Sequence, residues 1–289
     1  LSRGEKVRIL DNFSTGKMSH IKEFADKIEI VKGDIRNIKD IRKAVKGVTY
    51  VLHQAALRSV PKSVDNPTEN NEVNVTGTLN VLIASKEAGV KRLVYASSSS
   101  VYGDNEVFPQ KETLKPSPIS PYAVSKLAGE NYCVMFSKTY NFETVSLRYF
   151  NVFGPKQDPE SIYSAVIPKF IELAANKKPL TIHWDGKQSR DFTFVKNVAD
   201  VNIMAALLPN TAGKVYNVAV GTTISLLQIV KMLEKICGYK LEKVFQPKRK
   251  GDVRKTWADV SLMKKDFKYK PRFQFEEGLI KTWEWFGKN

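Results

Sequence analysis

Apolar and polar positions follow two different rhythms along the first half of the chain. Short, mostly apolar runs occur at residues 7–10, 28–31, 48–53, 92–96 and 144–149. Longer segments with apolar residues at helical spacing occur at 40–46, 72–88 and 122–140. Strands that alternate with helices in this way predict an α/β fold with a doubly wound parallel sheet.

The pattern changes after Gly154, where prolines mark loops and the predicted elements become shorter. Short strands are expected at 179–184, 192–195 and 215–220, helices at 199–208 and 226–238, and loops around Pro155, Pro159 and Pro168. This half predicts a smaller α+β lobe that is interleaved with the first domain. We expect residues 1–151 and 190–220 to form the sheet domain, and residues 152–189 and 221–289 to form the lobe.

The composition is that of an ordinary globular protein, with 42% hydrophobic and 26% charged residues among 289. No apolar run approaches the roughly 18 residues that a membrane span needs. Cys133 and Cys237 are too few for a disulfide framework, and no His, Cys or carboxylate cluster has metal-ligand spacing. We therefore expect a cytoplasmic protein without a structural metal.

The formal net charge of +16 favours polyanions such as nucleic acid. The basic residues are nevertheless dispersed, and the one dense cluster is 248–250, followed by Arg254 and Lys255. A lysine-rich solvated surface explains this distribution better, so nucleic acid is not the expected partner. An RNA-binding protein with weak catalysis stays open as an alternative.

Residues at the ends of the predicted strands are candidates for a dinucleotide site, because ligands of parallel sheets bind there. Asp11 and Asn12 follow the first strand, and a carboxylate at this place accepts both ribose hydroxyls of an adenosine, which favours NAD over NADP. Asp34 and Ile35 follow the second strand and are expected near the adenine edge. The small residues of Gln54-Ala55-Ala56 let a cofactor lie close to the backbone.

A dinucleotide-binding sheet normally opens with a strand, a glycine-rich turn and a helix. Residues 1–4 resemble the end of that helix. We therefore expect the glycine-rich turn about 20 residues before Asp11, the usual distance from the fingerprint to the acidic residue, so that the strand and its turn precede residue 1.

The sharpest candidate for chemistry is the pair Tyr122 and Lys126, which share a helix face at spacing i, i+4. An ammonium group near a phenol favours the phenolate, so we expect Lys126 to lower the pKa of Tyr122 and make it a general base. Such a pair alone is common on helix surfaces. Its value comes from the serine run 97–100 at the end of a strand, where a hydroxyl can meet the substrate oxygen and relay its proton to Tyr122.

Three stretches carry a resemblance to a known family: RLVYASSSSVYG at 92–103, SPYAVSK at 120–126 and RYFNVFGP at 148–155. They resemble the extended short-chain dehydrogenase/reductase superfamily, over essentially the whole chain. Further stretches are similar to the UDP-sugar 4-epimerases of that superfamily, at 53–56, 156–159, 165–169, 189–192, 216–221 and 251–254.

The resemblance implies a Rossmann domain that binds NAD and a 4-epimerase that works through a transient 4-keto sugar. The substrates would be UDP-N-acetylglucosamine and UDP-N-acetylgalactosamine, UDP-glucose and UDP-galactose, or both pairs. Tyr122, helped by Ser98, would take the proton of the sugar 4-hydroxyl while NAD takes the hydride, and Lys126 would hold the nicotinamide ribose. Further cofactor positions implied by the resemblance are Asn74, Ser97 and Tyr149.

The resemblance also implies the substrate contacts. The positions on the diphosphate and uridine ribose are Asn151, Arg190, Arg249 and Asp252. Thr256 stands where relatives restricted to glucose and galactose have a bulky tyrosine, which predicts room for an acetamido group. Arg58 stands where N-acetyl-preferring relatives have glycine and others lysine, so it either contacts the sugar or extends into solvent.

Two relationships within the superfamily affect the interpretation. A 4,6-dehydratase would need an Asp-Glu pair where this chain has Ser98-Ser99. A decarboxylase or a reductase fits the motifs of the lobe less well.

In relatives, the helices at 72–88 and 122–140 form a two-fold interface, which predicts a homodimer.

Overall fold

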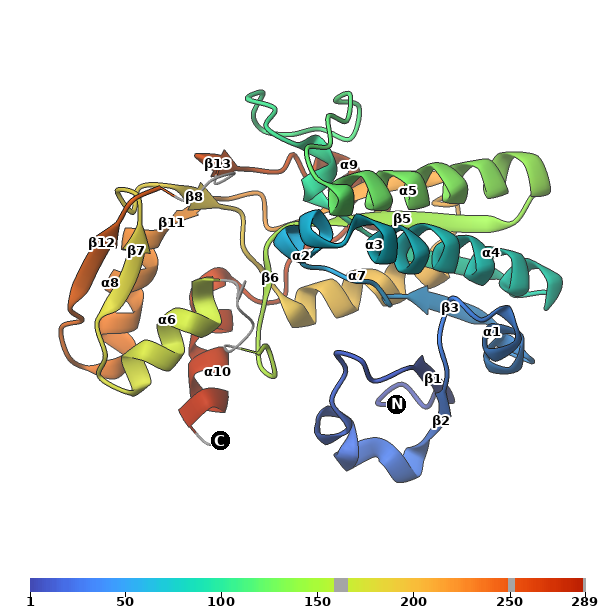
Figure 1. Ribbon diagram of the computed structural model, residues 1–289, viewed down its shortest axis with the longest axis horizontal. Helices are drawn as coiled ribbons and strands as arrows, with labels where there is room; N and C mark the ends of the chain where they lie inside the picture. The colour runs from blue at the N-terminus through green and yellow to red at the C-terminus, as the bar shows by residue number, and fades with distance from the viewer. Residues whose placement is uncertain (159–165, 249–252, 288–289) are drawn as a thin grey trace. The chain divides into compact units, whose positions relative to one another are not determined.

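The computed structural model describes residues 1–158, 166–248 and 253–287 (Figure 1). The chain divides into two compact units, each made of discontinuous segments. Unit 1 comprises residues 1–101, 118–147 and 205–215, and unit 2 comprises residues 102–117, 148–204 and 216–289. The predicted domains differ from these units mainly at 102–117 and 190–204, and the assignment of ligands to domains stays a prediction.

The strands expected in the first half of the chain are present. β1 (Val7–Asp11) pairs in parallel with β2 (Ile28–Lys32). A four-stranded sheet has the order β10-β5-β4-β3, with bounds Lys214–Val218, Glu143–Tyr149, Arg92–Ser98 and Tyr50–His53. β3 and β4 are parallel, so their carboxyl ends lie at one edge of the sheet.

The helices of unit 1 include three that the periodicity predicted and two that it did not. The predicted ones are α1 (Ile38–Val45), α4 (Gly77–Glu87, preceded by the π-helical turn η3, Glu72–Thr76) and α5 (Pro121–Tyr140). The short helices α2 (Val60–Asp65) and α3 (Pro67–Asn71) both have proline in their first turn. Two short 3-10 turns, η1 (Met18–His20) and η2 (Lys22–Lys27), lie between β1 and β2, and η4 (Ser99–Tyr102) follows β4.

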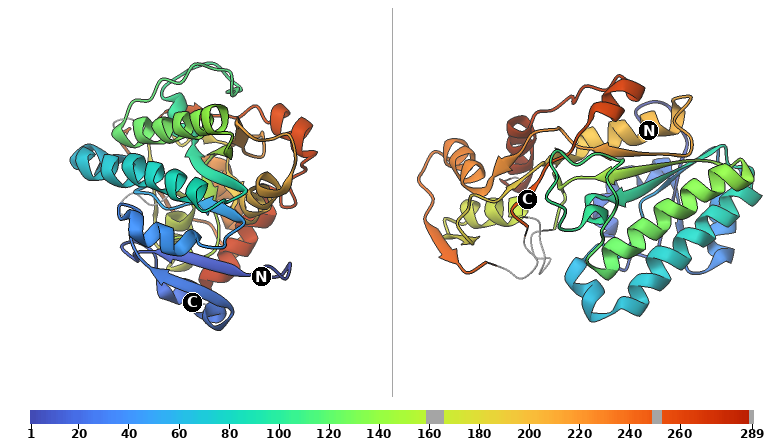
Figure 2. Two further views of the ribbon diagram at one scale, coloured as in Figure 1. Left: turned by 90° about the vertical axis from the view of Figure 1, so that its right-hand side faces the viewer. Right: turned by 90° about the horizontal axis from the view of Figure 1, so that it is seen from above.

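The two long helices of unit 1 lie side by side in all the views (Figure 1, Figure 2). α4 and α5 pack against β3 and β4 around a core that includes Leu82, Leu93, Tyr95 and Phe136. Cys133 of α5 is fully buried in this core, and burial raises the pKa of its thiol to about 12. Cys237, in unit 2, is partly exposed.

Unit 2 contains short strands and amphipathic helices. Its strands are β6 (Val152–Phe153) with β9 (Thr193–Phe194), β7 (Leu180–His183) with β12 (Lys243–Gln246), and β8 (Ser189–Arg190) between β11 (Ile224–Ser225) and β13 (Lys255–Thr256). Its helices are α6 (Val166–Ala175), most of α7 (Val195–Leu207), α8 (Leu226–Cys237), α9 (Ser261–Phe267) and α10 (Phe275–Gly287). The core of this unit is aromatic, and the ring of Phe153 contacts those of Phe192, Phe194 and Phe275.

Two expectations for this half were wrong. Pro168 does not mark a loop but lies within α6, near the described beginning of this helix at Val166. The strand expected at 192–195 ends at Phe194, and Val195 already begins α7, which starts four residues before the predicted helix. Within the described ranges, no helix is long and apolar enough to cross a membrane.

A buried arginine ties distant segments of unit 1 together. Arg92, which is 4% exposed, forms an ion pair with Glu143 on the neighbouring strand. Its Nη1 also donates to the carbonyl oxygens of Ala205 and Leu208 and to the hydroxyl of Thr211. The guanidinium therefore attaches residues 205–215 to the start of β4.

We expect Arg92→Ala to lower the free energy of unfolding by about 3 kcal/mol, because buried carbonyl oxygens and one carboxylate lose their donor. Arg42→Ala is the matched control, since the Arg42–Glu87 pair is half-exposed and should contribute less than about 1 kcal/mol. Urea denaturation measures both values, and equal losses for the two variants would contradict the role given to Arg92.

Candidate functional site

The start of α5 places Tyr122 beside the carboxyl end of β4. Ser120 caps this helix by accepting a hydrogen bond from the amide of Ala123, and Pro121 occupies the first helical position. Tyr122 follows directly, and its phenol lies near enough to the hydroxyl of Ser98, the last residue of β4, for a hydrogen bond with Ser98 to act on the pKa of the phenol. The structure therefore brings together the predicted tyrosine and serine.

Ser98 is oriented to act as a donor toward the phenol. Its oxygen accepts hydrogen bonds from the amide of Ser100 at 3.2 Å and from the Ser100 hydroxyl at 2.9 Å. A hydroxyl has two acceptor sites and one proton, so these contacts leave the proton for the Tyr122 oxygen. The sequence analysis gave Ser100 no role, and only its place in the serine run could have indicated one.

Lys126 is buried, with 4% of its surface exposed. Its Nζ donates to the carbonyl oxygen of Ala96 at 2.8 Å and lies 5.9 Å from the centre of the Tyr122 ring. Burial disfavours the ammonium form and lowers the pKa of Lys126 to about 8. Burial and the nearby positive charge of Lys126 lower the pKa of His53 to about 3. The His53 imidazole is therefore neutral, and it is hydrogen-bonded to the Thr78 hydroxyl.

The pKa of Tyr122 departs from the sequence-based expectation. We expected Lys126 to lower it, but the net shift is upward, because burial disfavours the phenolate. The opposing effects come from the Ser98 hydrogen bond and from the positive charge of Arg58, an exposed residue. The residues of unit 1 alone therefore leave Tyr122 protonated at neutral pH.

Asn74 lies in the π-helical turn η3 and is 1% exposed. Its side chain accepts from the amide of Leu57 at 2.8 Å and donates to the carbonyl of Leu57 at 2.9 Å. It also donates to the hydroxyl of Ser125 at 3.1 Å. Asn74 thus holds the segment that follows Gln54-Ala55-Ala56, of which Gln54 and Ala55 are exposed and Ala56 is partly buried.

Ser97 is turned toward the core. It is 2% exposed, and its hydroxyl donates to the buried carboxylate of Glu130 at 2.5 Å. Its side chain is therefore used within unit 1, and any contact of Ser97 with a cofactor would be made by its backbone.

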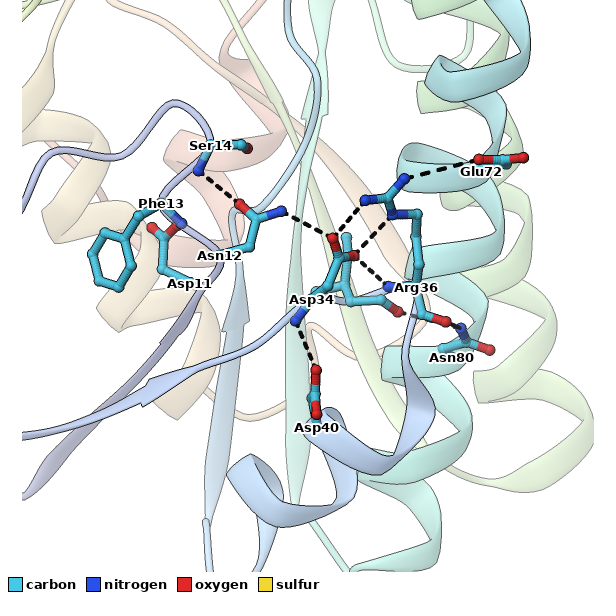
Figure 3. Close-up of polar contacts among 10 residues, drawn as sticks. Asp11, Asn12, Phe13, Ser14, Asp34, Arg36, Asp40, Glu72 and Asn80 are labelled. Carbon is cyan, nitrogen blue, oxygen red and sulfur yellow. Dashed lines mark hydrogen bonds and ion pairs between the residues drawn. The ribbon is translucent and has the colours of Figure 1, made fainter.

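The ends of β1 and β2 bring a second set of predicted residues together (Figure 3). Asp11 accepts a hydrogen bond from the amide of Phe13 at 2.7 Å, and Asn12 donates to Asp34 at 3.0 Å. Gly16 lies so close to Asp11 that a Cβ on it would be 2.8 Å from the carboxylate oxygen. Glycine at position 16 therefore lets the backbone of this loop pass close to the Asp11 carboxylate.

Arg36 is a member of this set that the sequence analysis missed. It binds both oxygens of Asp34, through Nε at 3.0 Å and Nη2 at 2.7 Å, and its Nη1 lies 3.9 Å from Glu72 (Figure 3). The hydrogen bonds of Arg36 and Asn12 hold the pKa of Asp34 well below its usual range, although burial acts in the opposite direction. Asp34 is therefore a fixed, ionised acceptor, which suits the amino group of an adenine.

Ile35 lies between these acidic residues and the helix layer. It is 7% exposed and packs against Gly77 of α4, where any Cβ would approach the Ile35 side chain to 2.7 Å. The side chain of Ile35 therefore belongs to the core, and only its backbone is suited to a cofactor contact.

In unit 2, the predicted substrate residues Asn151, Arg190 and Thr256 lie around Asp191. The side-chain amide of Asn151 donates to the carbonyl of Asp191 at 3.0 Å and to the Thr256 hydroxyl at 2.9 Å. Asn151 has a φ of 34°, in the left-handed region that asparagine tolerates better than most residues. Arg190 and Thr256 occupy the paired strands β8 and β13, in register with one another.

Asp191, to which the sequence analysis assigned no role, organises this cluster. Its carboxylate is fully buried and accepts from the amides of Val220 at 3.1 Å, Gly221 at 3.0 Å and Ala258 at 3.4 Å. Burial raises the pKa of Asp191 to about 7 despite these hydrogen bonds. A buried carboxylate could not be recognised in the sequence, because its amide partners come from two distant loops.

Three predicted residues, Tyr149, Arg249 and Asp252, are not part of the clusters described above. Tyr149 lies in unit 2, where its hydroxyl donates to Asn202 at 2.9 Å. Arg249 and Asp252 lie outside the described residues.

The chain is similar in sequence and in structure to known proteins. Residues 1–219 match the NAD dependent epimerase/dehydratase family. A UDP-N-acetylglucosamine 4-epimerase from Methanobrevibacter ruminantium, solved with UDP-N-acetylmuramic acid, is 39% identical, with a TM-score of 0.93 over 97% of this chain and 90% of its own. A Thermus thermophilus UDP-glucose 4-epimerase solved with NAD is 32% identical, with a TM-score of 0.89 over 99% and 92%. A putative UDP-glucose 4-epimerase of Methanocaldococcus jannaschii is 34% identical, over 98% of this chain and 91% of that protein.

The raised pKa of Asp191 predicts a pH dependence of stability. The ordinary pKa is 3.8 and the folded value is about 7, so the stability that this group contributes is complete below pH 3.8 and is lost as the pH rises through about 7. The unfolding free energy of the wild type, minus that of Asp191→Asn, should fall by a few kcal/mol between about pH 4 and pH 8, at about 1.36 kcal/mol per pKa unit.

Asp185→Asn is the control for this measurement. Asp185 lies in the same unit, but its hydrogen bonds with Arg254 lower its pKa, so its contribution to stability has the opposite pH dependence. Urea denaturation at several pH values compares the three proteins, and a difference for Asp191→Asn that does not change with pH would refute the assignment.

Proposed function

The chain belongs to the NAD dependent epimerase/dehydratase family, and from this premise we propose that it is a UDP-sugar 4-epimerase. Membership confirms the predicted superfamily, the Rossmann type of α/β fold, the enzymatic nature of the protein and NAD as its cofactor. The proposal adds the reaction, an inversion at C4 of a UDP-hexose without net oxidation.

The observation that carries the proposal is the arrangement of Ser98, Tyr122 and Lys126 in unit 1. The Ser98 hydroxyl is close enough to Tyr122 to lower the pKa of the phenol through a hydrogen bond, and both side chains stand at the carboxyl end of β4. A hydroxyl and a phenol in contact form a short proton path for a substrate alcohol. Ser98-Ser99 occupy the place where a 4,6-dehydratase would need an Asp-Glu pair, which favours epimerisation over dehydration.

NAD, when bound, supplies the hydride acceptor and donor for C4. The chain supplies the rest of the chemistry. Asp11 and Asp34 would bind the adenosine half, and Gln54, Ala55 and Ala56 after β3 would let the cofactor lie close to the backbone. Tyr122 would take the proton of the 4-hydroxyl as the hydride leaves and return it when the hydride comes back to the other face. The phenolate needs a stabilising charge, because burial raises the pKa of Tyr122, and Lys126 and the nicotinamide cation are suited to provide it.

Unit 2 would hold the nucleotide sugar. Arg190 and Asn151 are suited to the diphosphate, since a guanidinium and an amide donate to phosphate oxygens, and Arg249 and Asp252 complete the predicted set. Thr256 is small, and its hydroxyl accepts a hydrogen bond from Asn151, so we expect room for an acetamido group beside it. The 39% identity to a UDP-N-acetylglucosamine 4-epimerase supports the acetylated pair as the preferred substrates. Arg58 would lie near the sugar, as its effect on Tyr122 suggests.

Two further expectations belong to this proposal. A homodimer would form through η3 with α4 and through α5, the two long helical segments that lie side by side in unit 1. The enzyme would work in the cytoplasm, where UDP-sugars and NAD are both present.

We expect the protein, assayed with NAD in the full-length chain, to convert UDP-N-acetylglucosamine into UDP-N-acetylgalactosamine. Tyr122→Phe should lower kcat by at least about 100-fold, because the proton acceptor is lost while the ring keeps its packing. Chromatography of the two nucleotide sugars measures the reaction. If the wild type interconverts no UDP-hexose, the proposed function is wrong.

Thr256→Tyr should reduce kcat/KM for the acetylated sugars by about tenfold or more and leave UDP-glucose turnover nearly unchanged, because the larger side chain fills the space for the acetamido group. Thr256→Ser is the matched control, which keeps the hydroxyl that accepts from Asn151. Equal losses on acetylated and plain substrates would show that position 256 does not select the sugar.

A further inference from the structure

Both peptide groups of Tyr122 are held by side chains. Its amide donates to the Ser63 hydroxyl at 3.1 Å, and its carbonyl accepts from the Ser125 hydroxyl at 2.8 Å. Ser125 in turn accepts from Asn74 at 3.1 Å. Ser63 of α2 therefore binds the backbone of Tyr122 directly, and Asn74 of η3 is linked to it through Ser125.

The amide of Tyr122 depends on Ser63 because of its place in the helix. The first amides of a helix have no acceptor within the helix. The amides of Ala123 and Val124 are satisfied by the side chain and the carbonyl of Ser120, respectively. The amide of Tyr122 is the next one toward the N-terminus, and Ser63 is the acceptor that the described structure provides for it.

Ser63 is well placed to hold this amide in one position. It is 2% exposed, and its hydroxyl donates to the carbonyl of Val60 at 2.6 Å while it accepts from Tyr122. The hydroxyl therefore cannot rotate without losing one of two partly buried hydrogen bonds. Valine or alanine at this position would offer no acceptor, so the serine chemistry matters and not only the size.

The element that carries Ser63 is itself anchored. α2 begins at Val60, three residues after Leu57, whose amide and carbonyl are both bound by Asn74. Since Asn74 also contacts Ser125, one hydrogen-bonded network holds the 57–63 segment and the first turn of α5 together. The position of Tyr122 relative to Ser98 is then set by this network as well as by the packing of α5 on β4.

We propose that Ser63 is a positioning residue, whose hydroxyl fixes the first turn of α5 so that the Tyr122 phenol meets the proton of Ser98. The inference rests on the proposed function, because it assigns Tyr122 to proton transfer. Without the hydroxyl, the first turn of α5 gains freedom, and a displacement of about 1 Å at a reacting group can reduce the rate by about 100-fold.

The test compares Ser63→Ala with Ser137→Ala. Ser137 is the matched control, because its hydroxyl also donates to a backbone carbonyl, that of Phe142 at 2.9 Å, and accepts from a backbone amide, that of Thr144 at 3.0 Å. It lies on the same helix, 15 residues and about 22 Å from Tyr122. The Ser137 hydroxyl also contacts the Thr144 hydroxyl at 2.9 Å, so Ser137→Ala loses at least as many hydrogen bonds as Ser63→Ala. Only the hydroxyl of Ser63, however, touches the residue that bears the reacting phenol.

The expected result is a kcat for Ser63→Ala that is about 10-fold to 100-fold lower than that of the wild type, with KM for the UDP-sugar and the affinity for NAD within about twofold. Ser137→Ala should keep the kcat of the wild type. A pH profile of kcat gives a second readout. Because the Ser98 hydrogen bond lowers the pKa of Tyr122, its weakening should move the acid limb of Ser63→Ala to higher pH, and the limb of Ser137→Ala should not move.

The outcomes separate this inference from the proposed function. If wild type turns over UDP-hexoses and Ser63→Ala has the same kcat and acid limb as Ser137→Ala, Ser63 is only structural and the inference fails. If Ser63→Ala does not fold, Ser63→Cys replaces it, since a thiol of similar size is a weaker acceptor and should lower kcat to an intermediate value. An unchanged kcat and acid limb in Ser63→Cys would also overturn the inference. Failure of the wild type to turn over any UDP-hexose would instead refute the proposed function.

Discussion

The contact of α5 with β4 is the interaction on which the rest of unit 1 depends. Three residues on one face of the helix meet three successive residues of the strand: Gly129 meets Tyr95, Lys126 binds the carbonyl of Ala96, and Glu130 accepts from Ser97. A Cβ on residue 129 would lie 2.2 Å from the Tyr95 hydroxyl, so the helix can approach this closely only with glycine there. Lys126 and Glu130 are buried on this face, where hydrogen bonds to the strand replace hydrogen bonds to water. Rotation or sliding of the helix would break these bonds, so the contacts oppose such movements.

Much of unit 1 could be predicted because its determinants are local. The β1 to β5 strands and the two long helices follow from apolar periodicity, and the pairing of Tyr122 with Lys126 follows from helical spacing. The direction of the Tyr122 pKa could not be predicted, because burial depends on the packing around the phenol and not on its neighbours in sequence. Arg36 and Ser63 were missed for a related reason: each acquires its role from hydrogen-bond partners that the fold supplies.

Unit 2 was harder to predict from its sequence. Its strands are two to four residues long, too short for a clear alternation, and α6 contains a proline that the sequence favours as a loop residue. Arg190 was recognised, yet the buried Asp191 beside it connects more of the cluster. Long-range hydrogen bonds, rather than local propensity, determine where the predicted substrate residues of this unit lie.

The two cysteines differ in a way that has a practical use. Cys133 is fully buried, and its thiol, with a pKa raised to about 12, presents almost no thiolate to a reagent at neutral pH. Cys237, at the end of α8, is partly exposed. A maleimide dye should therefore attach at one place in the folded protein without any mutagenesis, and its fluorescence would report on unit 2 alone while unit 1 stays unlabelled.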